Sequence, residues 1–489
     1  MPPADQPSSH PHAPAILLAL AVVFLAAAPA RAELINYVGA SPSWSLDSNW
    51  NLSRAPVQND TVNITKSGAS VNYDPANSPI FSIITIDSTS TTDATPTLNI
   101  TPSSPTFDSG ILRVGYDHKG AIVQTGGIHN ASSWMGAVLG ANTGANGAYT
   151  LSGTGAILNV ESQLLVGDSG SATFTHTAGT VNINGALAIG SSPGSVSSYS
   201  FASGALNTID LQVAPYGGIG AFTHSGGAAS ITGELSIGNV NGSSTGSAVY
   251  THSGGSINAA ALNIRKNGTL THTGGTLKTA QLTIDLAGGK LDLTNQSMVV
   301  DYSASTTTPL ASIVAAIVSG AGSNRTWTGP GIISSSAASN NGLTGIGYAE
   351  ASDLFSLASD QTASWQGVTI DSSSVLVRYT KTGDADLDGS VNLNDLIRLA
   401  NSYGSTSGAK WTQGDFDYDG SVNLNDLIIL ANNYGSSLGL DLPMSDFPAD
   451  FQADLAQAFS GAAVPEPASA TLLLTITLGV LARRRSRFQ

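Results

Sequence analysis

Two short acidic stretches near the C-terminal end carry side chains of the types and spacing that bind a metal ion. Residues 383–405 and 414–436 are two copies of one motif at an offset of 31 residues, identical at 19 of 23 positions. Each copy places Asp at loop positions 1, 3 and 5, Gly at 6, Ser at 7, Asn at 9 and Asp at 12. In EF-hand loops this spacing supplies the six or more oxygens that a hard cation needs, and the glycine makes the sharp turn. The pattern therefore predicts two calcium ions.

The predicted ligands occupy equivalent positions in the two loops. They are Asp384, Asp386, Asp388, Ser390, Asn392 and Asp395 in the first loop, and Asp415, Asp417, Asp419, Ser421, Asn423 and Asp426 in the second. The serines contribute backbone carbonyls, and the asparagines reach the ion directly or through water. The aspartate at position 12 stands where most EF-hands have a bidentate Glu, so the shorter side chain must bring the following helix closer to the ion.

Short helices must position the last ligand of each loop. Apolar residues follow each loop at spacings of four and three, which indicates one buried helix face. These residues are Leu396, Ala400 and Tyr403 after the first loop, and Leu427, Ala431 and Tyr434 after the second. Gly404 and Gly435 are typical helix stops. The segment Ser374–Tyr379 alternates like a strand, so the unit is a loop followed by a helix, twice, with no entering helix.

A duplicated loop and helix with Asp at position 12 resembles a type I dockerin, over about 54 of the 489 residues. The chain departs from many dockerins at loop positions 10 and 11, where it has Leu393–Asn394 and Leu424–Asn425 in place of small hydroxyl residues. The resemblance implies a cohesin-like partner domain. The alternative is that calcium only holds a small module together, since four carboxylates per loop repel one another without the ion.

The N-terminal segment resembles a secretory signal peptide. Residues 1–32 contain the apolar run Ala15–Ala28 and a small-x-small cleavage pattern at Ala30–Ala32, so Glu33 is expected to begin the mature chain. The chain has no cysteine, so neither disulfides nor thiol chemistry contributes. We expect export to the envelope, to the surface or out of a bacterial cell.

The C-terminal tail has three parts. Pro465, Glu466 and Pro467 precede the apolar run Ala468–Ala482, and a basic cluster follows. This cluster contains Arg483, Arg484 and Arg485. The arrangement resembles the PEP-CTERM sorting signal of bacteria, which implies processing by an exosortase and a transient membrane helix with its arginines inside. A plain membrane anchor is the alternative, although about 15 apolar residues fall short of the roughly 20 that span a bilayer.

Between residues 111 and 295 the chain repeats every 20 to 28 residues. One repeated strand has the pattern Leu-x-apolar-Gly, and a second has an aromatic residue followed by Thr-His. The first occurs at Leu112–Gly115, Leu164–Gly167, Leu187–Gly190 and Leu235–Gly238, and the second at Phe174–His176, Phe222–His224 and Tyr250–His252. Two short strands per repeat and Gly-rich turns predict an all-β parallel β-helix, a β-solenoid with coils about 4.8 Å apart. The repeats do not determine the handedness of the coils, and a right-handed path is the prior expectation.

Stacking of these coils predicts a row of histidines. His176, His224, His252 and His272 should align along the rod, with Phe201 interrupting the row. Hydrogen bonding within the stack and metal binding are the two interpretations.

Both ends of the repeats are expected to be capped. A pattern that starts at Trp44 and Trp50 and continues through Asp60–Ile64 resembles the first coil of bacterial surface proteins with passenger-like repeats. The two tryptophans should cap the rod, and sugar binding is the alternative. The expected order is a signal peptide (1–32), an N-terminal cap with the first coils (33–110), repeats (111–295), a β cap (296–382), the calcium module (383–436), a linker (437–463) and the sorting signal with its membrane segment (464–489).

The composition limits the functions to be considered. A net charge of −15 argues against nucleic acid as a partner. The acids of the repeats are scattered, whereas glycoside hydrolysis needs two carboxylates held together, so we favour a non-catalytic protein. The leading hypothesis is an exported solenoid that docks into an extracellular or envelope assembly. The alternatives are a component that degrades or binds polysaccharide, and a surface or adhesion protein that calcium stiffens.

Overall fold

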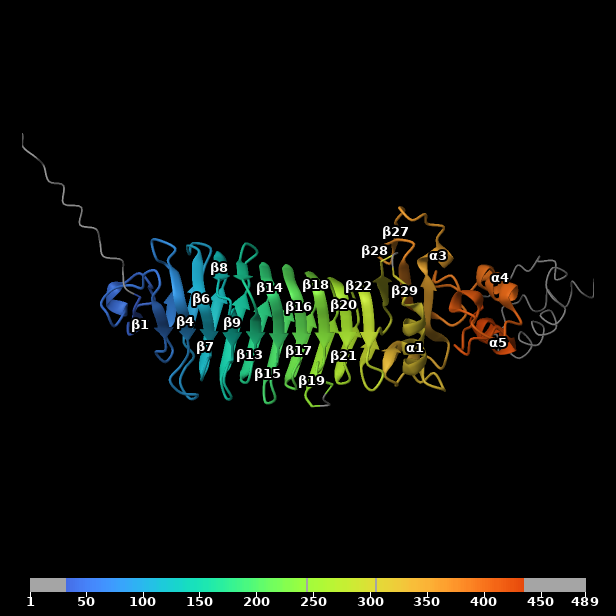
Figure 1. The fold of residues 1–489 in the computed structure, drawn as a ribbon, viewed down its shortest axis with the longest axis horizontal. Helices are drawn as coiled ribbons and strands as arrows, with labels where there is room; N and C mark the ends of the chain where they lie inside the picture. The colour runs from blue at the N-terminus through green and yellow to red at the C-terminus, as the bar shows by residue number, and fades with distance from the viewer. Residues whose placement is uncertain (1–31, 243–244, 304–305, 435–489) are drawn as a thin grey trace, which may run out of the picture.

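A computed structural model describes residues 32–242, 245–303 and 306–434 of the protein. This part of the chain is a long rod, an all-β solenoid of about 11 turns, which confirms the predicted β-solenoid. The N-terminal coils lie at one end, and helices α4 (Leu393–Ser402) and α5 (Leu424–Asn433) lie at the other (Figure 1). The predicted signal peptide, linker and sorting helix fall outside the described residues, apart from Ala32. None of the described helices combines the length and apolar character needed to cross a membrane.

Two long sheets run along the rod. The main path of the first, 16-stranded sheet is β1 (Leu34–Asn36), β2 (Thr61–Ile64), β4 (Ile80–Ile86), β6 (Phe107–Val114), β8 (Ile128–Ala131), β11 (Ile157–Val160), β14 (Thr180–Ile189), β16 (Ala205–Val213), β18 (Ala228–Ile237), β20 (Ser256–Ile264), β22 (Thr276–Ile284), β24 (Ser297–Asp301), β29 (Ser374–Lys381) and β26 (Thr344–Glu350), with β9 (Ala137–Leu139) and β12 (Leu164–Val166) beside it. The 11-stranded sheet is β25 (Gly331–Ile333), β23 (Lys290–Asp292), β21 (Gly268–His272), β19 (Ser247–His252), β17 (Ile219–His224), β15 (Val196–Phe201), β13 (Ser171–His176), β10 (Asn146–Leu151), β7 (Lys119–Gln124), β5 (Thr97–Ile100) and β3 (Ser70–Asn72).

The remaining elements lie at the two ends of the rod. They are the 3-10 helices η1 (Asp47–Asn49) and η2 (Trp411–Gln413), the helices α1 (Leu310–Ala321), α2 (Ser335–Ala338) and α3 (Ala351–Leu354), and the hairpin of β27 (Ala363–Trp365) and β28 (Val368–Ile370).

The coils differ in one respect from the two short strands that the repeats predict. From β14 to β22 the strand in the first sheet is nine or ten residues long. In the preceding coil the same path is broken into β11 and β12, which pair with the two halves of β14. A register shift between Ile183 and Ala186 marks the bend, where an additional residue turns the strand around the rod. The sequence pattern indicates each half of the long strand but not that the two halves are continuous.

The predicted histidine row is present inside the rod. His176 pairs in register with Phe201, Phe201 with His224, and His224 with His252, which pairs in turn with His272. Neighbouring rings in this row lie 4.7 to 4.8 Å apart, and the four histidines are fully buried.

Hydrogen bonds inside the coils engage both ring nitrogens of two of these histidines. His176 Nε2 donates to the carbonyl of Gly179 at 3.2 Å, so its Nδ1 accepts from the hydroxyl of Tyr199 at 3.1 Å. His224 makes the equivalent pair of contacts. Burial lowers the pKa of both imidazoles to about 4, so they are neutral at pH 7. These contacts confirm the hydrogen-bonding interpretation for both residues.

The N-terminal end is closed by the loop that carries Trp44 and Trp50. Both indoles are buried, their rings lie 4.9 Å apart, and Trp50 Nε1 donates to the carbonyl of Trp44. Trp44 also packs against Tyr73 and Phe81 of the first coils. The predicted capping role is therefore confirmed, and neither indole is available to stack on a sugar at the surface.

At the opposite end the direction of the strands reverses. β29 pairs antiparallel with β24, and β26 pairs antiparallel with β29, so the first sheet leaves its parallel path there. Strand β24 and helix α1 both lie within residues 296–382, the segment expected to cap the rod. The outer edge of β26 faces the two acidic loops, and this places the candidate site at the end of the rod.

Candidate metal centre

Each loop brings three carboxylates together. Ligand oxygens of Asp384, Asp386 and Asp388 all lie within 4.8 Å of one another, and the same is true of the second loop. The second triplet is Asp415, Asp417 and Asp419. Position 6 makes the turn with φ of +95° at Gly389 and +84° at Gly420, a conformation that glycine adopts without steric cost. The spacing in the sequence therefore brings together three of the six predicted ligands of each loop.

The carboxylate at position 12 is tied to the start of its own loop. Asp395 accepts from the backbone N–H of Ala385 at 2.7 Å and of Asn392 at 2.8 Å. Asp426 makes the matching contacts in the second loop, at 2.8 and 3.0 Å. Both carboxylates are fully buried. An ionised carboxylate has about four acceptor positions, so these contacts leave lone pairs available for an ion.

The asparagine at position 9 of each loop has a structural role that the sequence pattern did not predict. Asn392 and Asn423 are the N-caps of α4 and α5, and each side-chain oxygen accepts a backbone N–H two residues ahead, at 2.8 Å. Together with Asp395 and Asp426 they form capping boxes. The signal was present in the sequence as Asn-x-x-Asp directly before an apolar helix face. The asparagines therefore fix the orientation of the helices that carry position 12.

The electrostatics of the loops favours a cation. Burial, followed by interactions that include the neighbouring carboxylates, raises the pKa of Asp395 and Asp415 to about 7, and that of Asp384 and Asp426 to about 6. Backbone N–H donors oppose these increases but do not cancel them. Each loop places four carboxylates close together, two of them buried, and a bound cation offsets the cost of ionising them.

One atom tests directly whether the second loop fits an ion. Asp415 Oδ1 is buried and has no hydrogen-bond partner within the described part of the chain, whereas Oδ2 accepts from Gly420 N at 3.0 Å. A buried carboxylate oxygen without a donor is costly unless a cation coordinates it. The residues present therefore fit calcium, with oxygen ligands and no sulfur or nitrogen ligand among the six positions of the loop.

Both loops hold a non-glycine residue in the left-handed conformation at position 4. The φ angles are +59° at Leu387 and +66° at Tyr418, a region that side chains other than glycine rarely adopt. The Tyr418 hydroxyl donates to the carbonyl of Ile346 at 3.0 Å and accepts from its N–H at 3.2 Å. Ile346 lies in β26, so this one side chain pairs with the open edge of the last strand of the first sheet.

Further contacts attach the module to the cap. The Arg378 guanidinium donates to the carbonyl of Leu387, and the Thr380 hydroxyl donates to Asp384, the first predicted ligand. Asn433 in α5 donates to the carbonyl of Thr382 at 2.6 Å. The loops are thus part of the closure of the rod, an arrangement that their sequence does not reveal.

Two surface pockets in the described part of the chain are candidates for a reaction site. One pocket of about 360 Å³ lies between β29 and the first loop and is lined by Arg378 and Lys381, and a second of about 260 Å³ lies beside Arg265 and Asp285. Neither of these two pockets brings two carboxylates together, as glycoside hydrolysis requires. The predicted sorting residues at 465–467 and 483–485 lie outside the described residues.

No family model, curated protein or solved structure matches this chain.

Proposed function

We propose that the protein is an exported, non-catalytic β-solenoid that binds two calcium ions at the end of its rod and docks there into an extracellular or envelope assembly. The observation that carries the proposal is the pair of aspartate triplets, each with its first carboxylate buried, together with the buried and unpartnered Oδ1 of Asp415 in the second. When bound, calcium supplies the positive charge that the loops lack. The chain supplies a fixed frame, because backbone N–H groups, capping boxes and contacts with β29 hold the carboxylates in place.

The docking surface is proposed on the two helices. Equivalent positions of α4 and α5 remain exposed, namely Asn394 and Asn401 in the first and Asn425 and Asn432 in the second. Ile428 adds an apolar side chain that is 37% exposed. The likeness of the motif to type I dockerins supports a cohesin-like partner. The proposed signal peptide and the Pro465–Pro467 sorting signal, cut by an exosortase, account for delivery to the envelope.

A calcium-dependent pull-down tests docking. The chain from residue 33, immobilised, should capture a cohesin-like partner from an envelope extract in calcium and release it on chelation. Asp386→Asn with Asp417→Asn should abolish capture, because each loop loses a central ligand. Asp360→Asn removes an exposed acid outside the loops and should leave capture unchanged. If the module binds calcium but captures no partner, its remaining role is to close the end of the rod. The contact between Tyr418 and Ile346 supports that role as well.

Carbohydrate binding is the second candidate, because one face of the rod carries unused hydroxyl groups. Six hydroxyl side chains lie in register on six consecutive strands of the 11-stranded sheet. They are Thr150, Thr175, Ser200, Thr223, Thr251 and Thr271. In the described part of the chain these hydroxyls make no hydrogen bond, whereas two residues further on the hydroxyls of Ser253 and Thr273 donate to the preceding coil. A neutral, regularly spaced row of this kind suits hydroxyl-rich polymers.

Sedimentation with insoluble polysaccharides tests this candidate. Thr223→Lys places a charge in the middle of the row and should weaken binding several-fold. Thr283→Lys, on an exposed position of the other sheet, should not. Equal binding by both variants would exclude this face as the binding surface, and release of reducing sugar would contradict a non-catalytic role.

A further inference from the structure

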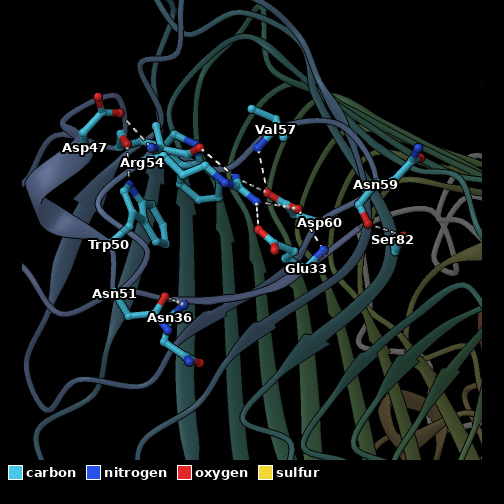
Figure 2. Close-up of polar contacts among 12 residues, drawn as sticks. Glu33, Asn36, Asp47, Trp50, Asn51, Arg54, Val57, Asn59, Asp60 and Ser82 are labelled. Carbon is cyan, nitrogen blue, oxygen red and sulfur yellow. Dashed lines mark hydrogen bonds and ion pairs between the residues drawn. The ribbon is translucent and has the colours of Figure 1, made fainter. Parts of the chain in front are cut away.

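A buried carboxylate in the N-terminal cap gathers four contacts. Asp60 is fully buried and accepts from the backbone N–H of Glu33 at 3.0 Å, from Val57 N at 2.9 Å and from both terminal nitrogens of Arg54, the closer at 2.6 Å (Figure 2). The Glu33 carboxylate pairs with Arg54 at 2.8 Å. Asp60 therefore holds the start of β1 and the cap loop together.

The nitrogen of Glu33 is fixed in position by the solenoid itself. Glu33 directly precedes β1, which pairs in register with β2, and the carbonyl of Glu33 accepts from Thr61 N at 2.9 Å. This nitrogen thus points at Asp60 because the first strand pair places it there. The same nitrogen belongs to the peptide bond at which the signal-peptide pattern predicts cleavage.

We propose that hydrolysis of the Ala32–Glu33 peptide bond creates a structural ion pair between the new α-ammonium group of Glu33 and the carboxylate of Asp60. Water adds across the C–N bond, Ala32 leaves with a carboxylate, and Glu33 keeps the nitrogen, which takes up a proton. The proposal rests on the proposed export of the protein, in which residues 1–32 are a cleaved signal peptide. Its geometry does not depend on which peptidase cuts the bond.

The charges around Asp60 are unbalanced before the cut. Arg54 contributes one positive charge, and Asp60 and Glu33 contribute two negative charges, so the group carries a net charge of −1. The Asp47 carboxylate of the same cap accepts from the backbone N–H of Ala55 at 2.8 Å. A terminal ammonium group adds one positive charge and makes the net charge of this three-residue group zero. It also replaces the neutral N–H of Glu33 with a charged donor, which binds the buried carboxylate of Asp60 more strongly. The strengthened contact therefore forms only when the signal peptide has been removed.

The ion pair makes the stability of the cap depend on pH. An α-amino group has an ordinary pKa of about 7.7 to 8.0, and pairing with Asp60 raises this pKa in the folded state. The added stability is therefore complete below about pH 7.7 and is lost as the pH rises through the raised value. If pairing raises the pKa of the amine by about 1, the opening equilibrium of the cap changes about tenfold.

Hydrogen exchange measured by mass spectrometry tests the ion pair. The protein that begins at Glu33 with a free amine is compared with the same protein acetylated there. At about pH 7 peptides from residues 33–64 should exchange about tenfold more slowly in the free form, a difference that shrinks as the pH rises above the raised amine pKa. Peptides from β20 to β22 serve as the internal control and should not change. In Asp60→Asn, acetylation should have no effect, whereas in Glu33→Gln the effect should persist.

Three results would overturn the proposal. They are equal exchange in the free and acetylated proteins, an effect of acetylation that survives in Asp60→Asn, and an exported protein whose N-terminal residue is not Glu33. If Asp60→Asn does not fold, NMR titration of the α-amino group in the unsubstituted protein decides, because an ordinary pKa of about 7.7 to 8.0 excludes the pair. None of these readouts involves calcium or a docking partner.

Discussion

Calcium should stabilise the C-terminal end of the rod more strongly as the pH rises from about 5 to about 8. In the calcium-free protein burial raises the pKa of Asp395 and Asp415 to about 7. These folded carboxylates bind protons that the unfolded chain has already released above the ordinary Asp value of 3.8. Stability of the calcium-free protein is therefore lost as the pH rises through about 7, and bound calcium restores it.

The size of the effect follows from one proton per loop. With a pKa of about 7, the carboxylate is about 1% ionised at pH 5 and about 90% ionised at pH 8. The apparent calcium affinity of each loop should therefore rise about 100-fold over this range, or about 3 kcal/mol per loop. We count one proton per loop because neighbouring carboxylates that repel one another titrate as a group rather than independently.

The assay is urea unfolding at each pH with saturating calcium and with chelator. The quantity of interest is the difference between the two free energies, because the buried histidines contribute equally to both and cancel. Asp415→Asn should remove about half of the pH dependence, and Asp360→Asn, an exposed acid outside the loops, should keep it. A difference that stays constant or falls from pH 5 to pH 8 would refute a calcium site built on buried carboxylates.

Three further predictions concern single side chains. Tyr418→Phe should lower the free energy of unfolding, measured in urea with calcium, by about 2 kcal/mol, because it leaves two buried backbone groups of β26 unpaired. The control Tyr216→Phe, at a half-exposed side chain, should change it by less than about 0.5 kcal/mol. Burial lowers the pKa of His252 to about 3, so the folded imidazole stays neutral at pH 5, whereas the unfolded one is protonated below about 6.5. His252→Phe removes this penalty, so from pH 8 to pH 5 its free energy of unfolding should rise by about 2 kcal/mol relative to that of the unsubstituted protein. Phe201 shows that the row accommodates a phenyl ring. Acid unfolding in saturating calcium measures this change. Trp44→Ala should cost about 4 kcal/mol through the cavity it leaves in the N-terminal cap, seen as faster hydrogen exchange in residues 34–64 but not in β20.

The features that the sequence predicted well are those with a local period. The carboxylates of each loop are grouped because their spacing within a dozen residues suffices to place them. The histidine row was predictable because each coil repeats its neighbour in register, so residues such as His224 and His252 stack without any information from elsewhere in the chain. Local spacing and repetition together determine most of the rod and the candidate ligands.

The features that the sequence did not reveal depend on contacts between distant segments. Tyr418 and Ile346 are separated by 72 residues, and Asn433 and Thr382 by 51. Neither pair has a pattern that repeats, so composition and periodicity carry no information about them. The continuity of the long strands from β14 to β22 was missed for a related reason, because a bulge changes the register of the alternation on which the prediction depends.

The four differences between the two motif copies indicate how the module is attached. The shared positions build the two candidate ion sites, whereas three of the four differences place contacting groups in the second copy. Phe416 replaces Ala385 and packs its ring 5.1 Å from that of Trp411, whose Nε1 donates to the carbonyl of Asp384 in the first loop.

Tyr418 replaces Leu387 and pairs with the edge of β26, and Asn433 replaces Ser402 and donates to the carbonyl of Thr382 beside β29. The first copy has Leu387 and Ser402 at the positions of Tyr418 and Asn433, and its loop is held instead by side chains of β29. The duplicated motif therefore has two parts: identical residues build two equivalent groups of carboxylates, and the residues that differ join the second loop to the first and to the end of the solenoid. Loss of calcium from the second loop should consequently loosen the last strand of the rod, whereas loss from the first should act mainly on β29.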